Sequence, residues 1–326
     1  MSNFMVMKKN SITRRDVIAG IGAIPITFLG TLFTSSTVKL NAAQQPKINA
    51  EFIYCLNTGT IRAQRVRLDK IVEIASKAGY QAIEPWISDV EDYVKSGGSL
   101  SDLKNKISDL GLTVEGAIGF PQWAVDDDAA RSKGVERAKY EMDLMAQIGG
   151  KRVAAPPSGI NRTPGIDLSK VAERYRVLLE EGDKIGVVPQ LEFWGSSANL
   201  NKLSQCMCVA IESGHPKACV LPDVFHMYKG GSNFEGIRLC SAAAIQVFHL
   251  NDYPSQPPRE QINDGGRVMP GDGIAPLKQI IQNLNEIGGR KVLSIELFNK
   301  KYYEMDALET AKIGIEKMKA AVKNAI

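Results

Sequence analysis

The sequence predicts a closed (β/α)8 barrel of the TIM-barrel type, in a single domain that follows an N-terminal leader. From residue 48 onward, short apolar runs rich in β-branched residues alternate with longer helical patterns, and this unit repeats eight times with short joining segments. Strict alternation of strand and helix predicts a parallel sheet, and eight repeats predict that the sheet closes on itself. An open doubly wound sheet is the alternative, but no GxGxxG motif follows the first expected strand.

Each repeat joins one expected strand to one expected helix. The helices carry apolar residues at i, i+3, i+4 and i+7, as in Leu68, Ile71, Val72 and Ala75, which is the pattern of a helix with one buried face. Most helices end in a glycine, the residue that best adopts the left-handed conformation there. The expected strands are 50–56, 81–86, 112–120, 151–157, 187–194, 218–225, 245–252 and 291–298. The expected helices are 67–79, 100–111, 130–150, 167–186, 199–214, 234–242, 273–289 and 307–325, of which 234–242 is the weakest.

The first 43 residues have the features of a secretory leader. A basic start and the pair Arg14–Arg15 precede an apolar stretch from Val17 to Phe33, and this order predicts a twin-arginine signal peptide with export to the periplasm or the exterior. Glycines and a proline interrupt the apolar stretch, so stable membrane insertion is not expected. We therefore assign residues 1–43 to the signal and residues 48–326 to the barrel.

Charge and cysteine content narrow the function classes. The first 43 residues hold five basic residues and one acidic residue, which accounts for the whole formal net charge of +4. The rest of the chain is near neutral and predicts no basic surface for nucleic acid. The five cysteines contain no CxxC pair, so we expect buried apolar cysteines without disulfides. The expected partner is a small molecule, and a homo-oligomer is an open alternative.

In such a barrel the active site lies at the carboxyl ends of the strands, and polar and aromatic residues gather at those positions. They are Glu84 and Trp86 at the second strand, Phe120 and Trp123 after the third, Glu192 and Trp194 at the fifth, Asp223 and His226 at the sixth, His249 at the seventh and Glu296 at the eighth. All three tryptophans and two of the three histidines of the chain thus fall at one end of the barrel.

Four of these residues, on four consecutive strands, predict a metal site: Glu192, Asp223, His249 and Glu296. Three converging carboxylates repel each other unless a cation lies between them. Three oxygen ligands and one imidazole nitrogen suit one divalent ion. Mn2+ is the first expectation, with Mg2+, Co2+ and Zn2+ as alternatives. The competing interpretation is that these residues are loop charges paired with arginines.

The motifs around these residues resemble a known family. The segments LEFW, LPDVFH, FHLND and LSIELF, in this order and spacing, resemble the xylose-isomerase-like barrel superfamily, in its sugar isomerase and epimerase branch. The resemblance covers residues 48–320. It implies that Glu192, Asp223, His249 and Glu296 bind one divalent ion, and that Glu192 and Glu296 also serve as acid and base.

The resemblance extends to residues that would bind substrate. It implies that His226 holds a substrate oxygen, and the segment GGRVMPGDG resembles the family stretch that supplies an arginine, here Arg267. Independently of the family, the apolar C–H faces of a sugar or keto-sugar would pack on Trp86, Trp123 and Trp194, and Glu84 would bind a hydroxyl. The alternatives are that the tryptophans fill the barrel mouth as core and that Glu84 pairs with an arginine.

The sequence therefore predicts a metal-dependent sugar isomerase or epimerase. A metal chelated by the substrate stabilises the enediolate left when a proton next to a carbonyl departs, and a nearby carboxylate can serve as the base. Two alternatives use the same residues: a lyase that performs β-elimination on a 3-keto-glycoside, and a sugar-binding barrel without catalysis. The DNA-repair endonuclease branch of the superfamily is not expected, because its three-zinc site needs more histidines than the three present.

Overall fold

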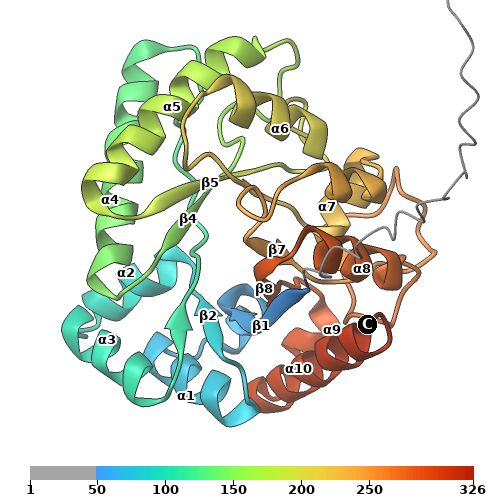
Figure 1. Cartoon of the computed structure of the whole chain (residues 1–326). Coiled ribbons are helices and arrows are strands. Elements are labelled where there is room, and N and C mark those ends of the chain that lie inside the picture. Colours follow the sequence, from blue (N-terminus) through green and yellow to red (C-terminus); the bar gives the residue numbers. More distant parts are fainter. Residues whose placement is uncertain (1–48) are drawn as a thin grey trace, which may run out of the picture. The chain divides into compact units, whose positions relative to one another are not determined.

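The computed structural model describes residues 49–326, which form the predicted (β/α)8 barrel. Figure 1 shows the strands at the centre and the helices in a ring around them. The predicted signal, residues 1–43, lies outside the described residues. Between residues 49 and 326 no helix is both long and apolar enough to cross a membrane.

Eight strands in the expected order make the barrel, and each is shorter than its expected segment except β1, which is one residue longer. The strands are β1 (Ala50–Asn57), β2 (Ala82–Glu84), β3 (Thr113–Val114), β4 (Arg152–Ala155), β5 (Val188–Glu192), β6 (Val220–Leu221), β7 (Val247–His249) and β8 (Gly289–Ile295). The observed pairs are all parallel.

The main helices also lie where the apolar periodicity placed them. They are α1 (Leu68–Ala78), α3 (Leu100–Asp109), α4 (Asp128–Gln147), α5 (Leu168–Ile185), α6 (Leu203–Glu212), α8 (Leu277–Ile287) and α10 (Ala307–Lys323). Gly79 and Gly186 end α1 and α5 with φ of 92° and 87°, as the glycine pattern predicted. Short elements that the sequence did not predict are η1 (Thr58–Gln64), α2 (Ile87–Lys95), α7 (Val224–Gly230), η3 (Asp264–Gly266) and α9 (Lys300–Tyr303).

The barrel closes through a few hydrogen bonds between two ladders. One ladder has the order β3-β2-β1-β8-β7 and the other β4-β5-β6. The Ala154 N–H donates to Ala117 O (2.8 Å) on one side, and on the other side the His249 N–H donates to Pro222 O (2.9 Å). The second contact pairs Asp223 with His249, so closure of the barrel is what places these two predicted ligands side by side.

Two apolar clusters fill the fold. The smaller one fills the inside of the barrel, and its members are Ile53, Cys55, Ala82, Ile118, Ala154, Leu221, Val247 and Val292. The larger one lies between the strands and the surrounding helices. Full burial of a Leu, Ile or Val side chain contributes about 1.5–3 kcal/mol, so this second cluster is the main apolar contribution to stability. All five cysteines are free and four are buried as predicted, whereas Cys208 is exposed.

The region after β6 differs from the prediction, which continued the strand to residue 225. The strand ends at Leu221, and α7 begins at Val224 because Asp223 caps it: Asp223 Oδ1 accepts a hydrogen bond from the His226 N–H (2.8 Å). A carboxylate at this position satisfies a backbone donor that the first helical turn leaves free. The helix predicted at 234–242 is a short 3-10 helix, η2 (Phe234–Leu239).

A buried carboxylate lies at the opposite, amino-terminal end of the strands. Glu115 is within ion-pair distance of Lys151 Nζ (2.7 Å), Arg290 Nη2 (2.9 Å) and Arg152 Nη1 (3.5 Å). Burial favours the neutral acid, but the hydrogen bonds from Arg290 and Lys151 outweigh it and hold the pKa of Glu115 at about 2, below its ordinary value of 4.5. Glu115 therefore joins β3 to the starts of β4 and β8.

Glu115→Gln is expected to lower the free energy of unfolding at pH 7 by about 3 kcal/mol, the equivalent of the pKa shift. Because the folded-state pKa is depressed, this stability is fully present above the unfolded pKa near 4.5 and is lost as the pH falls toward 2. Urea titrations of both proteins between pH 3 and pH 7 test this, with exposed Glu316→Gln as the control. A difference in stability that stays constant over this range would contradict the assignment.

Candidate active site

The predicted site residues meet in a pocket of about 240 Å3 at the carboxyl ends of the strands. Six of them line it: Trp86, Glu192, Trp194, His226, Arg267 and Glu296. Asp223 and His249 are buried next to it, at 1% and 0% exposure, and both contact Glu296 or its neighbour Arg267. The convergence follows from the topology, since parallel strands in a barrel all end on the same face.

Asp223, His249 and Glu296 form a group that fits a divalent ion. Each offers one ligand atom within 4.8 Å of the others. His249 Nδ1 lies 3.3 Å from Glu296 Oε2 and 3.6 Å from Asp223 Oδ2, but it is buried without a hydrogen-bond partner. A buried ring nitrogen and two carboxylate oxygens that face one another are a suitable set of donors for a cation once the imidazole is neutral.

Glu192 lines the same pocket, but the structure does not place it in this three-residue group. Its Oε2 is buried and makes no hydrogen bond. Burial, followed by the charge of Glu296, raises the pKa of Glu192 to about 8. A carboxyl group with a free oxygen and a pKa near neutrality can exchange a proton with a substrate. The unpaired oxygen of Glu192 fits acid–base chemistry, and its role as a fourth ligand stays a prediction.

His249 of β7 is oriented by Glu84, the last residue of β2. His249 Nε2 is 2.9 Å from Glu84 Oε2, and that oxygen also accepts a hydrogen bond from Ser294 Oγ (2.6 Å). A carboxylate at Nε2 fixes the tautomer that leaves Nδ1 free for a metal. Burial alone would lower the pKa of His249, but the charges of Glu84 and Glu296 outweigh it and raise this pKa well above its ordinary value.

The structure places Glu84 behind the pocket wall. Glu84 is 1% exposed and is not part of that wall. Its side chain points into the barrel, where it reaches His249 of β7 and Ser294 of β8. It pairs with a histidine and not with an arginine, so the arginine alternative is wrong, whereas contact with a substrate hydroxyl stays a prediction.

Both terminal nitrogens of Arg267 are engaged by its neighbours, whereas its Nε is buried without a hydrogen-bond partner. Its Nη1 donates to Asp223 Oδ2 (2.8 Å) and Glu296 Oε2 (3.1 Å), and its Nη2 donates to Asp264 Oδ1 (2.6 Å). Desolvation favours the neutral acid at Asp223, but the guanidinium outweighs it and lowers the pKa of that carboxyl group. Arg267 is in the pocket wall as predicted, with its charge balanced by these carboxylates.

His226 lies between Arg267 and the backbone of the loop that follows β5. Its Nδ1 accepts a hydrogen bond from the Gly195 N–H (3.3 Å), and its Nε2 is 3.1 Å from Arg267 Nη2. Burial, followed by the charge of Arg267, lowers the pKa of His226. The imidazole is therefore neutral at physiological pH and is placed as a polar, uncharged part of the wall.

Aromatic side chains form the outer wall of the pocket. The ring of Phe120 is 5.2 Å from that of Trp86 and 6.0 Å from that of Trp194, and Phe298 packs edge-on against Trp86 at 5.9 Å. The guanidinium of Arg62 stacks on Trp86, 3.9 Å from the ring centroid. Such a wall offers apolar faces against which the C–H groups of a sugar ring can pack.

Trp123 does not belong to this wall, contrary to the prediction. It is 0% exposed, its Nε1 donates to Pro156 O (2.9 Å), and its ring packs against Tyr175 of α5. The chain turns outward after Phe120, so Trp123 packs between helices instead of at the barrel mouth. Trp123 is therefore a core residue, although not at the barrel mouth where the alternative interpretation placed it.

The residues of the site that were missed from the sequence include Asn57, Asp264 and Phe298. Asp264 and Phe298 line the pocket, and Asn57 is buried at the end of β1 against Glu84 and Glu296. Asn57 could have been found by the same test that found the others, because it is the polar residue that ends the first strand. Asp264 carries no such signal, because it begins the short helix η3 between β7 and α8 and does not end a strand.

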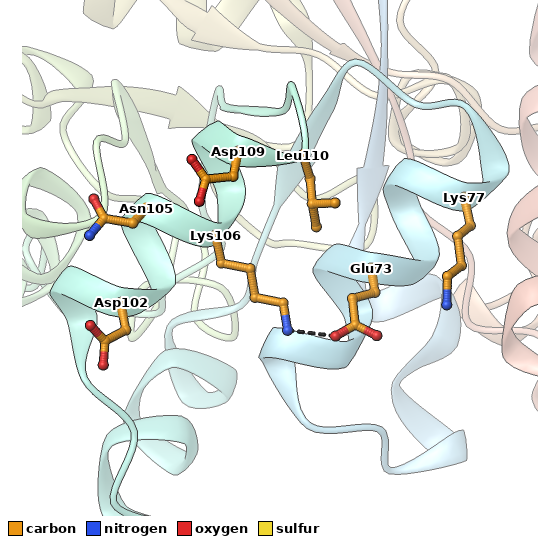
Figure 2. A pocket seen from close by; sticks show the side chains of 7 residues that line it. All are labelled: Glu73, Lys77, Asp102, Asn105, Lys106, Asp109 and Leu110. Carbon is orange, nitrogen blue, oxygen red and sulfur yellow. Dashed lines mark hydrogen bonds and ion pairs between the residues drawn. The ribbon is translucent and has the colours of Figure 1, made fainter.

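A second hollow, shown in Figure 2, lies on the outside of the barrel between α1 and α3. Two of its charged residues form an ion pair, with Lys106 Nζ 2.6 Å from Glu73 Oε1. It is formed by helix surfaces and is remote from the strand ends. None of the side chains that line it has a buried polar atom without a hydrogen-bond partner, whereas the pocket has such atoms at Glu192 and Arg267.

Sequence comparison identifies relatives along nearly the whole barrel. The inosose isomerase of Bacillus velezensis is 29% identical over 277 residues, which covers 82% of this chain and 96% of that protein. Among solved structures, the IolI protein with a bound zinc atom superposes with a TM-score of 0.77 at 24% identity, covering 84% of this chain and 99% of that one. The structure of L-ribulose 3-epimerase superposes with a TM-score of 0.68 at 21% identity, covering 84% and 96%.

A family model, the xylose isomerase-like TIM barrel, matches residues 72–321. The match includes every residue of the group Glu84, Glu192, Asp223, His249 and Glu296. The chain therefore belongs to the xylose isomerase-like TIM barrel family, in its sugar isomerase and epimerase branch, and is an enzyme of the isomerase or epimerase type.

Proposed function

We propose that the protein is a divalent-metal-dependent isomerase or epimerase of a small, uncharged keto-sugar or cyclic keto-polyol. The observation that carries the proposal is the buried group Asp223, His249 and Glu296 next to the unpaired carboxyl oxygen of Glu192, all at one end of a small pocket. Similarity to an inosose isomerase supports an inosose, a six-membered polyhydroxy ketone, as the first substrate to test.

Asp223, His249 and Glu296 would hold the ion, whose charge would stabilise the enediolate that forms when a proton next to a carbonyl leaves. Manganese is our proposal for the ion, and metal analysis would decide among Mn2+, Mg2+, Co2+ and Zn2+. Glu192 takes and returns the proton through its unpaired oxygen. Glu296 is the second proposed acid–base residue, and Arg267 and His226 orient the substrate oxygens by hydrogen bonds.

The charges in the pocket favour an uncharged substrate. Carboxylates of Glu192, Asp264 and Glu296 line it, whereas the one permanently cationic side chain in its wall, Arg267, is already paired with three carboxylates. The divalent ion would offset two of these negative charges, but a phosphate or carboxylate on the substrate would still find the terminal nitrogens of Arg267 already paired with carboxylates. We therefore expect free keto-polyols to be better substrates than sugar phosphates or hydroxypyruvate.

The size of the pocket bears on the lyase alternative. About 240 Å3 is below the 300–1,000 Å3 typical of sites for drug-sized ligands, which suits one sugar-sized ring. A 3-keto-glycoside would have to place its second group outside the pocket, beyond Phe120 and Trp194. The size thus favours isomerisation or epimerisation of a single ring over β-elimination from a glycoside.

Incubation of the metal-loaded protein with an inosose or a free ketose in deuterated water is expected to yield an isomer with deuterium next to the carbonyl. Nuclear magnetic resonance and mass spectrometry would identify the position of the label. A substrate deuterated at that carbon should react more slowly, and this arm detects proton abstraction even where the proton is returned without exchange.

Two outcomes of this experiment would contradict the proposal. Release of a second group with an unsaturated product would establish a lyase. Turnover with neither solvent label nor a slower reaction of the deuterated substrate would rule out proton abstraction next to the carbonyl.

A further inference from the structure

Asn57 ends β1, between the two strands that carry Glu84 and Glu296. The register of β1 with β2 pairs Asn57 with Glu84, and the register of β1 with β8 pairs Leu56 with Ile295. The side chain of Asn57 is therefore flanked by the carboxylates of Glu84 and Glu296, and it is 0% exposed. A buried amide needs partners for both its N–H2 and its carbonyl.

The amide makes four hydrogen bonds. Its Nδ2 donates to Glu84 Oε2 (2.9 Å) and to Glu296 Oε1 (3.2 Å). Its Oδ1 accepts from Trp86 Nε1 (3.0 Å) and from the Gly59 N–H (2.8 Å). These partners fix the orientation of the amide, because the reversed orientation would place its carbonyl against two carboxylates and its N–H2 against two donors.

The four contacts connect the ligand group to the wall of the pocket. On one side, Glu296 Oε1 is held by Asn57, so that Oε2 is the oxygen facing His249 and Arg267. On the other side, the indole of Trp86 is held at its Nε1. Gly59 leaves room for this junction, since a Cβ there would come within 2.9 Å of both Asn57 Oδ1 and Trp86 Nε1.

We propose that Asn57 is a positioning residue that selects which oxygen of Glu296 faces the ligand group and couples that choice to the position of Trp86. It touches neither the pocket interior nor the expected substrate. It acts through Glu296, through Glu84 and His249, and through the aromatic wall. The kinetic part of this inference rests on the proposed function, whereas the structural part and the metal-binding part do not require turnover.

Two variants test the N–H2 donor and the carbonyl acceptor of the Asn57 amide separately. Asn57→Asp keeps an oxygen toward Trp86 and Gly59 but replaces the donor with a second carboxylate oxygen facing Glu84 and Glu296. Asn57→Leu has a similar volume and removes both halves. Asn57→Asp keeps the acceptor for the Gly59 N–H, so its effect on metal affinity reports the half of the amide that faces Glu84 and Glu296.

We expect Asn57→Asp and Asn57→Leu each to weaken the binding of Mn2+ or Zn2+ by about 10- to 100-fold, as is typical when partners of metal ligands are removed. We expect kcat to fall by a similar factor, with KM changed less than about threefold. Calorimetric metal titration and steady-state kinetics of the purified full chain would measure these effects. Wild-type metal affinity and wild-type kcat in Asn57→Asp would overturn the proposal.

A double-mutant cycle tests the link to the wall. Trp86→Phe keeps an aromatic ring and removes the indole N–H. If the indole acts on Glu296 through Asn57, Asn57→Leu with Trp86→Phe should be no worse in metal affinity than Asn57→Leu alone. Additive losses would show that the two residues act independently, which would overturn the coupling.

A crystal structure of a folded Asn57 variant would test the positioning role without any measurement of turnover. Rotation of the Glu296 carboxylate in Asn57→Leu, or in Asn57→Asp if the leucine variant does not fold, would support positioning by Asn57. An unchanged Glu296 would overturn it. Failure of the wild-type protein to turn over any keto-polyol, together with a rotated Glu296 in the variant, would contradict the proposed function and leave the positioning role supported.

Discussion

His249→Ala is expected to bind divalent metal at least about 100-fold more weakly than the wild type, which should bind about one ion per chain. The substitution removes the one nitrogen of the ligand group and leaves Glu84 buried without its imidazole partner. Loss of an outer-shell partner alone typically costs 10- to 100-fold, and loss of a ligand should cost at least as much. Elemental analysis after dialysis and calorimetric titration would measure both proteins.

His215→Ala is the matched control for this experiment. His215 pairs with Asp183 outside the barrel (3.3 Å) and lies in no ligand group of the described residues. Circular dichroism and thermal unfolding would establish that both variants fold, and His249→Gln offers a milder change if the alanine variant does not. Equal metal content in a folded His249 variant and in the wild type would remove His249 from the site.

Glu296→Gln is expected to lower turnover by roughly a hundredfold or more, the effect typical of losing a general base. The structure adds a second cause. Oε1 accepts from Asn57 Nδ2 and Oε2 accepts from Arg267 Nη1, so the amide N–H2 of glutamine would face a donor in either orientation. The substitution thus removes the charge and also leaves one donor without its acceptor.

Steady-state kinetics with the best keto-polyol would measure this effect, and Glu316→Gln on the exposed face of α10 is the control. Metal content should be determined for the same preparations, because a loss of the ion and a loss of the base both lower turnover. Unchanged turnover in Glu296→Gln with metal bound would exclude Glu296 from catalysis and leave Glu192 as the sole acid–base residue.

Much of the fold follows from local patterns in the sequence. The apolar periodicity of segments such as 68–75 and the glycines that end helices, such as Gly79 and Gly186, require only short-range steric and solvation effects, and both are found in the structure. The strand predicted over residues 218–225 is too long, and the reason is local. Asp223 is both a strand-end carboxylate and a helix cap, and the capping role ends the strand early.

The sequence by itself determined the barrel and the set of strand ends at which Glu192, Asp223, His249 and Glu296 are found, because parallel strands of alternating β/α units end on one face. Only the tertiary structure decided which of these atoms lie close enough to share an ion, because side-chain distances across the barrel depend on strand register and closure. It separated Trp123 from Trp86 and Trp194, although all three follow strand ends in the sequence. It also assigned Glu84 to His249 and Asn57 to Glu296, since hydrogen bonds between strands far apart in the chain leave no periodic signal in the sequence.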